Sequence, residues 1–304
     1  MIAKSIAFVL LALLLPAAGH AACVLQNKAT IPLQPTAAGI TLPVEVNGIT
    51  ATFILDTGAE RSVVTGEAVQ RLRLARDAWV GTTMRGVGGI ERRPNADPSS
   101  LSLGGQPLVR RTLSRDHSLT VAVLPGTAGA TGIVDGLLGR DYLALFDLDI
   151  DLPNRRLTLY QVVGCTGRFL PWPGGYVSIP MTTSAADAVV LPVALDGRPL
   201  RALLDTGATS SLLAAPGMYK MGLTPEHLSA DPSAQISGLG PRTLTVHRHR
   251  FDALTVANQT VASPSLWVEP IRPSPIVDML LGADFLAGRH IWISFATRQV
   301  FLAK

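Results

Sequence analysis

Charged residues are scarce in this sequence, and the basic ones are scattered. Only 16% of the 304 residues are charged while 47% are hydrophobic, which excludes a disordered or solvating chain. Lys and Arg number 26 against 22 Asp and Glu, a net charge of +4. The short basic clusters at Arg92-Arg93 and at residues 247–250 are too small to indicate binding to nucleic acid.

Metal-ligating residues are also few. The run His247-Arg248-His249-Arg250 would place both histidines on one face of a strand, where they could hold a metal. A solvated strand face is the more common outcome of such a run. We therefore predict no metal site and no cofactor.

Long apolar runs are missing as well, since the longest, at residues 5–16, falls short of the roughly 20 residues of a bilayer span. It follows Lys4 and precedes small residues that end at Ala21, the pattern of a secretory signal peptide. We expect residues 1–21 to be a cleaved signal and the protein to be exported, either periplasmic or secreted. Membrane attachment would require an uncleaved signal. A lipid anchor on Cys23 is the minor alternative, because His20 stands where a lipidation box needs an aliphatic residue.

Only two cysteines occur, Cys23 and Cys165, and both remain if cleavage falls after Ala21. An exported chain meets oxidising conditions, which favour pairing. We predict a disulfide that ties the mature N-terminus to the connector between the two halves of the chain.

One motif occurs twice. Residues 54–59 read Ile-Leu-Asp-Thr-Gly-Ala, and residues 203–208, at an offset of 149 positions, read Leu-Leu-Asp-Thr-Gly-Ala. A Leu-Leu-Gly block follows each copy, at residues 137–139 and 280–282. Asp-Thr-Gly alone would be an ordinary turn, but two copies with shared flanks indicate a duplicated and fused module.

The duplication sets the domain organisation. We predict one lobe over residues 22–163, a Pro- and Gly-rich linker over residues 164–175, and a second lobe over residues 176–304. Each lobe closes with a strand, at residues 156–160 and 299–302.

Each Asp-Thr-Gly copy is predicted to follow a β-hairpin. In the first lobe alternating residues 40–46 lead to the turn Asn47-Gly48, and the strand over residues 50–55 returns to Asp56. The second lobe repeats this with strands at residues 189–195 and 200–204, a turn at Asp196-Gly197, and then Asp205. Short helices are expected at residues 66–74 and 214–221, and near Asp141 and Asp284. Two Gly-rich hairpin tips are candidate flaps over a ligand: Gly86, Val87, Gly88 and Gly89, and Gly238, Leu239 and Gly240.

Two carboxylates from symmetric halves of one chain can form a dyad that shares one proton. Because Asp56 and Asp205 could not both ionise cheaply at close range, one pKa would rise. The ionised member could then act as general base on a water while the protonated member polarises an amide carbonyl. This chemistry requires neither a metal nor a covalent intermediate.

These residues resemble the aspartic peptidases, and within them the retropepsin-like group. Ala59 and Ala208 after the Asp-Thr-Gly copies are the retropepsin form, and neither candidate flap carries the aromatic residue found in pepsin flaps. The resemblance covers nearly the whole mature chain. It implies a mostly β, bilobal fold with pseudo-two-fold symmetry and a cleft for an extended protein or peptide substrate. It also implies endopeptidase activity and, for bacterial members, export. Since the duplication supplies both carboxylates, a monomer is sufficient.

The resemblance also implies roles for individual residues. Asp56 and Asp205 would be the catalytic dyad, and Glu60 and Arg140 would form a structural ion pair beside it. The supports of the dyad would be Thr57, Gly58, Thr206 and Gly207. Pro241 after the second candidate flap is a departure, so the two flaps need not be equivalent. The alternative is a catalytically silent protein that uses the same cleft to bind a peptide, a glycan or a partner protein.

Overall fold

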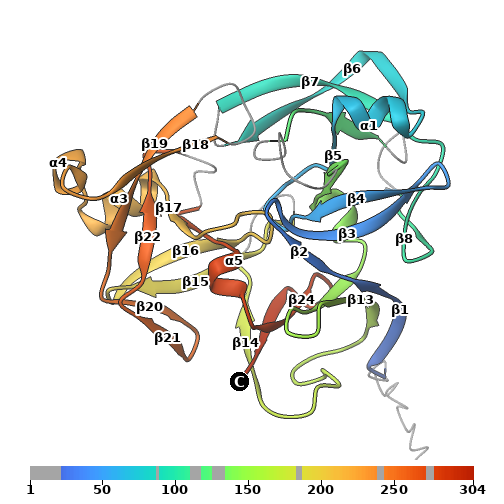
Figure 1. Cartoon of the computed structure of the whole chain (residues 1–304). Coiled ribbons are helices and arrows are strands. Elements are labelled where there is room, and N and C mark those ends of the chain that lie inside the picture. The colour runs from blue at the N-terminus through green and yellow to red at the C-terminus, as the bar shows by residue number, and fades with distance from the viewer. Residues whose placement is uncertain are drawn as a thin grey trace, which may run out of the picture.

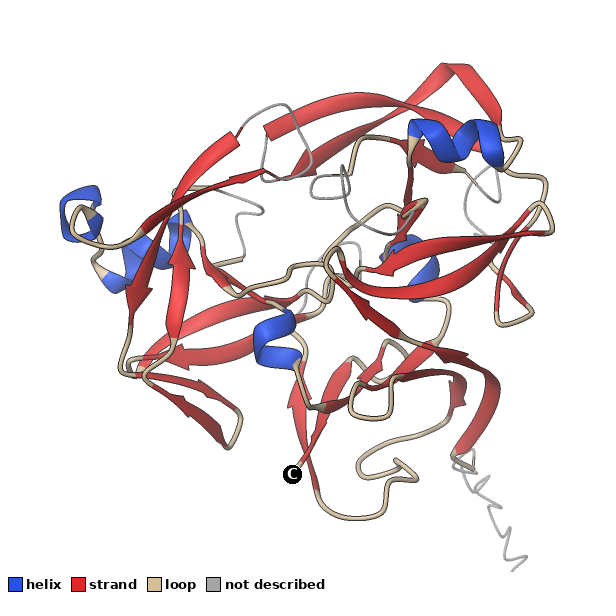
Figure 2. Ribbon diagram, in the orientation of Figure 1, coloured by secondary structure: helices blue, strands red, loops and turns tan. Residues whose placement is uncertain are grey.

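The computed structural model describes residues 22–86, 89–109, 118–124, 134–182, 187–237, 243–271 and 277–304. Strands dominate it and form three sheets, as Figures 1 and 2 show. Two of the sheets build the two lobes and the third joins them, which confirms the mostly β, bilobal prediction. The predicted signal, residues 1–21, lies outside the described residues.

The lobe 1 sheet has ten strands. In spatial order they are β6 (Ala75–Gly86), β7 (Gly89–Asp97), β10 (Leu119–Val121), β5 (Val63–Val64), β11 (Gly136–Leu138), β4 (Ile49–Leu55), β3 (Gly39–Val46), β8 (Leu101–Leu103) and β9 (Gln106–Pro107), with β2 (Gln34–Thr36) paired to β3.

The lobe 2 sheet repeats this order with nine strands. They are β18 (Ser233–Ser237), β19 (Thr243–Arg250), β22 (Ser265–Val268), β17 (Leu212–Leu213), β23 (Met279–Leu281), β16 (Arg198–Leu204), β15 (Val190–Leu195), β20 (Ala253–Val256) and β21 (Gln259–Ala262). The parallel pairs also correspond, since β11 pairs with β4 as β23 pairs with β16. The internal duplication read from the sequence is therefore a duplication of topology.

The hairpins that lead to the two Asp-Thr-Gly copies have the predicted turns. Asn47 and Gly48 both adopt positive φ, at 52° and 73°, and Asp196 and Gly197 repeat this at 47° and 75°. Two consecutive residues with positive φ make the type I′ turn, whose twist matches that of the flanking strands.

The third sheet is shared by both lobes. Its six strands, in spatial order, are β1 (Val24–Pro32), β13 (Arg156–Val163), β12 (Asp147–Asp151), β24 (His290–Ser294), β25 (Gln299–Ala303) and β14 (Tyr176–Pro180). At its centre β12 of lobe 1 pairs with β24 of lobe 2, with Ile150 opposite Ile291. The two halves of the chain are thus joined by backbone hydrogen bonds.

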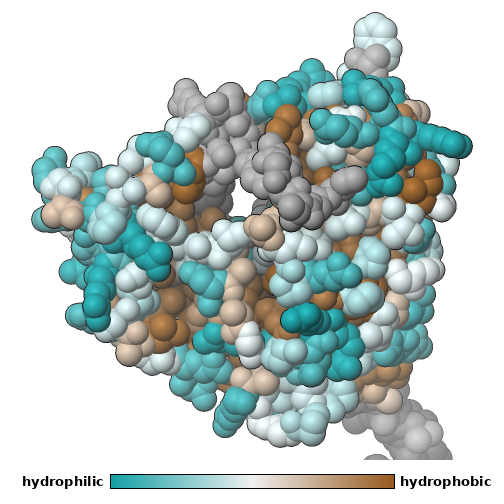
Figure 3. All heavy atoms as spheres, viewed as in Figure 1, coloured by the Kyte–Doolittle hydropathy of each residue, from teal (hydrophilic) through white to brown (hydrophobic). Residues whose placement is uncertain are grey.

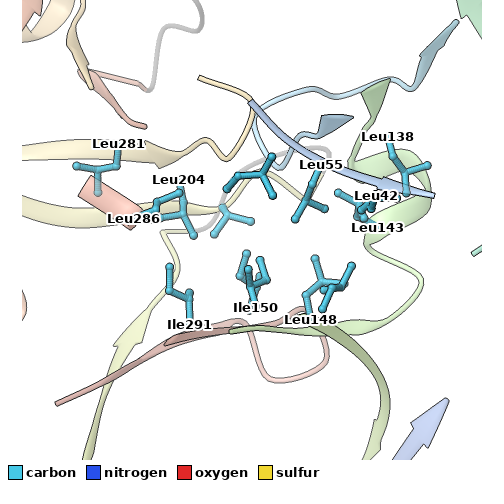
Figure 4. Packing of buried hydrophobic residues seen from close by; sticks show 14 of the residues in the cluster. Leu42, Leu55, Leu138, Leu143, Leu148, Ile150, Leu204, Leu281, Leu286 and Ile291 are labelled. Carbon is cyan, nitrogen blue, oxygen red and sulfur yellow. The ribbon is translucent and has the colours of Figure 1, made fainter. Parts of the chain in front are cut away.

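One hydrophobic core runs through both lobes and onto the shared sheet. Figure 4 shows Leu55 of β4 and Leu204 of β16 on one side of this core and Leu148, Ile150 and Ile291 of the shared sheet on the other. Leu55 and Leu204 are the residues directly before the two aspartates. The ends of the aspartate-bearing strands are therefore fixed by fully buried side chains.

The helices are short: α1 (Gly66–Arg71), α2 (Arg140–Leu143), α3 (Ala215–Met221), α4 (Pro225–Leu228) and α5 (Ala283–Leu286). Arg71 of α1 pairs with buried Asp135 at 2.5 Å, and Lys220 of α3 pairs with buried Asp278 at 2.6 Å. In each lobe, an ion pair with a buried aspartate thus holds a helix in place. Within the described ranges, no helix is long and apolar enough to cross a membrane.

The connector between β13 and β14 contains neither helix nor strand. Its Cys165 forms a disulfide with Cys23. Trp172 of the connector packs edge-on against Tyr176 and Trp292, at ring distances of 5.9 and 6.4 Å. The connector is therefore held against the shared sheet at both ends.

Candidate active site

Each aspartate of the repeat lies in the loop directly after a central strand. The backbone N–H of Asp56 donates to Leu138 O at 3.1 Å, and that of Asp205 donates to Leu281 O at 2.9 Å. Two backbone N–H groups then donate hydrogen bonds to each carboxylate. Gly58 and Ala59 donate to Asp56 Oδ1 at 2.9 and 2.8 Å, and the matching pair Gly207 and Ala208 donates to Asp205 Oδ1 at 3.0 Å each.

The two threonines interlock across the pseudo-two-fold axis. Thr57 Oγ1 donates to Leu204 O at 2.7 Å and accepts from the Thr206 N–H at 3.1 Å. Thr206 Oγ1 mirrors this by donating to Leu55 O at 2.6 Å and accepting from the Thr57 N–H at 3.0 Å. Both threonines are buried, so the two loops are held to each other by four hydrogen bonds shielded from water.

The two glycines show that the carboxyl groups face each other. A Cβ added to Gly58 would overlap the carboxyl group of Asp205, and one added to Gly207 would overlap that of Asp56. Each carboxyl group therefore packs on the backbone of the opposite loop, and any side chain at either glycine would displace it.

The two carboxyl groups have unequal proton affinities. Burial raises the pKa of Asp56, which the N–H groups of Ala59 and Gly58 and the charge of Arg140 then oppose. Burial and the neighbouring charge of Asp56 raise the pKa of Asp205 to about 8. Asp56 is therefore the member that ionises first and Asp205 the member that keeps the proton.

Arg140 lies beneath the first loop and is buried. Its Nη1 donates to Thr57 O at 3.0 Å and to Gly58 O at 2.7 Å. Glu60 is exposed, and its charge helps to keep Arg140 protonated against the lowering of the pKa of Arg140 by burial. A direct Glu60–Arg140 ion pair stays a prediction.

Two serine–aspartate contacts, whose role the sequence analysis missed, brace the loops. Ser62 Oγ donates to Asp141 Oδ1 at 2.7 Å and accepts from Gly139 N at 2.8 Å. In lobe 2 Ser211 Oγ donates to Asp284 Oδ1 at 2.6 Å and accepts from Gly282 N at 3.0 Å. Ser62 and Ser211 also share the offset of the repeat, and this was the signal that could have revealed them.

The candidate flaps lie in the sequence between the paired strands β6 and β7 and between β18 and β19. Figure 1 shows the described strands of these two hairpins reaching toward each other over the centre of the molecule. Gly86 pairs with Gly89 at the end of the first hairpin. The remaining predicted tip residues, Val87 and Gly88, and Gly238, Leu239 and Gly240, lie outside the described residues. The surface is hollowed between the two lobes, with apolar side chains in the hollow (Figure 3).

Metal-binding residues do not gather anywhere in the described part of the chain, where no three His, Cys, Asp or Glu side chains are close enough to hold one ion. His249, one of the two strand histidines noted in the sequence, lies with Nδ1 2.6 Å from Asp231 Oδ2.

Comparison with known proteins agrees with this geometry. The chain is similar in fold to the aspartic proteinase from Irpex lacteus, with a TM-score of 0.52 and 13% sequence identity over 93% of this chain and 97% of that one. A search of curated proteins finds no match. The family model described as aspartyl protease matches twice, over residues 42–142 and 191–285, so that each match spans one of the two Asp-Thr-Gly loops. With both halves of the duplication matched, the chain belongs to the aspartyl protease family.

Proposed function

We propose that this protein is an active aspartic endopeptidase that hydrolyses peptide bonds of an extended protein substrate. The observation that carries the proposal is the facing pair of carboxyl groups with unequal proton affinities. Asp56 and Asp205 are each fixed by two N–H donors, and the loops that hold them are interlocked by Thr57 and Thr206. Such preorganised groups are what acid–base catalysis requires.

The asymmetry assigns a role to each carboxyl group. Ionised Asp56 takes a proton from a water as the water oxygen attacks the peptide carbonyl carbon. Asp205 gives its proton to the carbonyl oxygen, so a neutral tetrahedral diol forms. The proton on Asp56 then passes to the leaving nitrogen as the C–N bond breaks, and Asp205 recovers its proton from a diol hydroxyl. The pair ends the cycle as it began, with one shared proton.

The proposed setting is outside the cytoplasm, in the periplasm or the medium. The Cys23–Cys165 disulfide supports this, because disulfides persist in oxidising compartments. The apolar run at residues 5–16 supports it independently. Radioactive or immunological detection of a shortened chain in the periplasmic fraction, with residue 22 as its N-terminus, would test both the export and the cleavage.

The test of the activity is cleavage of an unfolded protein substrate across about pH 3 to 7, the range in which a carboxylate dyad can hold one proton. The mature chain is compared with Asp56→Asn and Asp205→Asn, and with Asp252→Asn as a control at an exposed aspartate of lobe 2. We expect either dyad substitution to abolish cleavage and the control to leave it unchanged. Loss of activity with only one of the two, or cleavage that survives both, contradicts a shared site. Absence of cleavage by a folded wild-type protein would favour the silent, binding alternative.

A further inference from the structure

Glu269 is a buried acid whose carboxyl group has no hydrogen-bond partner in the described part of the chain. It directly follows β22 and is 1% exposed. Both of its carboxyl oxygens are buried, and neither has a hydrogen-bond partner among the described residues. The other acid of this lobe that is buried to a similar degree, Asp278, is paired with Lys220. Burying a carboxyl group without hydrogen bonds costs folding free energy, so its presence calls for a functional explanation.

The direction of Glu269 follows from the alternation along its strand. Leu266 and Val268 face the main core. Trp267 and Ile271, on the other face, pack against a second cluster, which we call the lobe 2 wall. Its buried members are Val190, Leu203, Leu212, Ala214, Val246, Val277 and Leu280. Since side chains alternate along an extended chain, Glu269 lies on the same face as Trp267 and Ile271, against the lobe 2 wall.

The lobe 2 wall lies between the catalytic loop and the flap hairpin. Leu203 stands two residues before Asp205, and Leu280 lies on the strand beside it. Ile236, from the flap hairpin strand β18, packs against the same cluster. Side chains of a substrate held under this hairpin would therefore meet the wall that contains Glu269.

Lobe 1 has a corresponding apolar cluster, in which an alanine takes the place of Glu269. Ile54, Val63, Ala122, Leu124 and Leu137 form its buried cluster, and Met84 of the flap hairpin packs on it. Ala122 N donates to Val64 O at 3.0 Å, as Glu269 N donates to Leu213 O at 3.0 Å. Ala122 is thus the counterpart of Glu269, and a methyl group in one lobe stands where the other has a carboxyl group.

Glu269 is too far from the dyad to move protons in the reaction. Its strand, β22, is separated from β16, which carries Asp205, by β17 and β23. Three strand spacings amount to about 14 Å. An extended peptide advances about 3.3 Å per residue, so this distance corresponds to substrate side chains a few residues from the cleaved bond.

The chemistry of the site selects a cation. Burial raises the pKa of Glu269 to about 7, and neither oxygen has a hydrogen-bond donor among the described residues. The carboxyl group by itself therefore favours its neutral form. An ammonium or guanidinium group entering the wall would pair with the carboxylate and supply the missing donors. A neutral side chain of the same length would leave the acid unsatisfied.

Building on the peptidase function proposed above, we propose that Glu269 is a specificity-determining residue, which makes the subsite in the lobe 2 wall select a Lys or Arg side chain of the substrate. The matching subsite in lobe 1, with Ala122, has no such preference. The two halves of a nearly symmetric site would thus bind different side chains of the substrate.

The test is a cleavage-site profile of peptides from digested proteins, with wild type, Glu269→Gln and the control Glu226→Gln, which removes an exposed acid of the same lobe on α4. We expect Lys and Arg to be enriched at one substrate position. A peptide with Lys there should exceed its norleucine analogue in kcat/KM by at least about tenfold. Glu269→Gln should bring this ratio close to one, whereas Glu226→Gln should keep the ratio of the wild type. No basic preference, or one that survives Glu269→Gln, overturns the proposal.

A wild-type protein that cleaves nothing would refute the peptidase function but not yet the role of Glu269. In that case binding of the same Lys and norleucine peptides to the intact chain is measured by fluorescence anisotropy. A Lys preference that Glu269→Gln removes would sustain the assignment. Equal binding of the two peptides, or none, would end it.

Discussion

At the scale of single residues, the two Asp-Thr-Gly loops are nearly identical and Arg140 breaks their symmetry. Its counterpart in lobe 2 is Ala283, and the residue matching Glu60 is Thr209. Burial raises the pKa of Asp56, and the backbone N–H groups of Ala59 and Gly58 and the charge of Arg140 oppose that rise. Arg140 is thus a charge that acts on the proposed base of a nearly symmetric pair and has no cationic counterpart at position 283 of lobe 2.

This asymmetry predicts a change of pH dependence in Arg140→Ala. Arg140 favours the ionised form of Asp56, so its removal raises the pKa of Asp56 and the base is ionised only at higher pH. The acidic limb of the kcat/KM profile should move upward by about 1 pH unit. Two buried carbonyls, Thr57 O and Gly58 O, also lose their donor, at a cost of about 1–3 kcal/mol in unfolding free energy. A pH–rate profile and a denaturant titration measure the two effects, and an unmoved acidic limb would contradict the role of Arg140.

The ion pair between Glu60 and Arg140 has its own test. If the two side chains are paired, Arg140→Ala should destabilise more than the double change with Glu60→Thr, because the single change leaves an acid without its cation. The double variant makes lobe 1 resemble lobe 2 at both positions. Equal losses of unfolding free energy would argue against pairing and leave the carbonyl contacts as the role of Arg140.

Residues of the candidate site were predictable from the sequence where they belong to a repeated motif. Asp56 and Asp205 stood out because the same hexapeptide appears twice, and the Thr and Gly beside them came with it. Glu269 has no such signal, because a glutamate after a strand reads as an exposed residue unless its burial is known. The sequence predicted that one pKa of the pair would rise, but which of the two depends on the burial and the charges around the folded pair, which no local pattern gives.

At the scale of elements, α2 and α5 are braced by the serines that follow the two Asp-Thr-Gly copies. Ser62→Ala would leave Gly139 N and Asp141 without the hydroxyl, and Ser211→Ala would do the same to Gly282 N and Asp284. We expect each to lower the unfolding free energy by about 1–3 kcal/mol. Ser265→Ala, at an exposed serine of β22, should stay within about 0.5 kcal/mol.

Chemical denaturation of the three serine variants separates these cases. Similar losses in Ser62→Ala and Ser211→Ala would indicate that the two equivalent serines contribute equally to stability. A loss no greater than that of Ser265→Ala would show that the hydroxyls do not support the loops.

Elements with local signals were predictable, and those with distant partners were not. The hairpins at Asn47-Gly48 and Asp196-Gly197 follow from turn chemistry that a few residues encode. β1 was missed, because its pairing with β13 joins Val24 to Val163 and is not visible in either segment alone. The sheet shared by the lobes escaped prediction for the same reason, although its strands β13 and β25 were foreseen as the closing strands of their lobes.

At the scale of the whole molecule, the Cys23–Cys165 disulfide closes a loop of 142 residues, which contains almost all of lobe 1. In the chain-entropy account a cross-link of this span stabilises by up to about 5 kcal/mol. We expect the double change Cys23→Ser and Cys165→Ser to lower Tm markedly. Reductant should lower the Tm of the wild type to the same value and leave the variant unaffected, and a wild type insensitive to reductant would contradict this contribution.

The disulfide loop and the shared sheet also determine the order in which parts of the fold can form while the chain is synthesised. Cys23 and Cys165 emerge before any strand of lobe 2, so the first half can be closed covalently while the second is still unfinished. Asp205 then appears, but β24 and β25, which complete the shared sheet, follow much later in the chain. A nascent chain therefore carries one of the two carboxyl groups, and then both of them without the sheet that joins their lobes, until β24 and β25 have been made. The order of the strands along the chain thus leaves the shared sheet as the last of the three sheets to be completed.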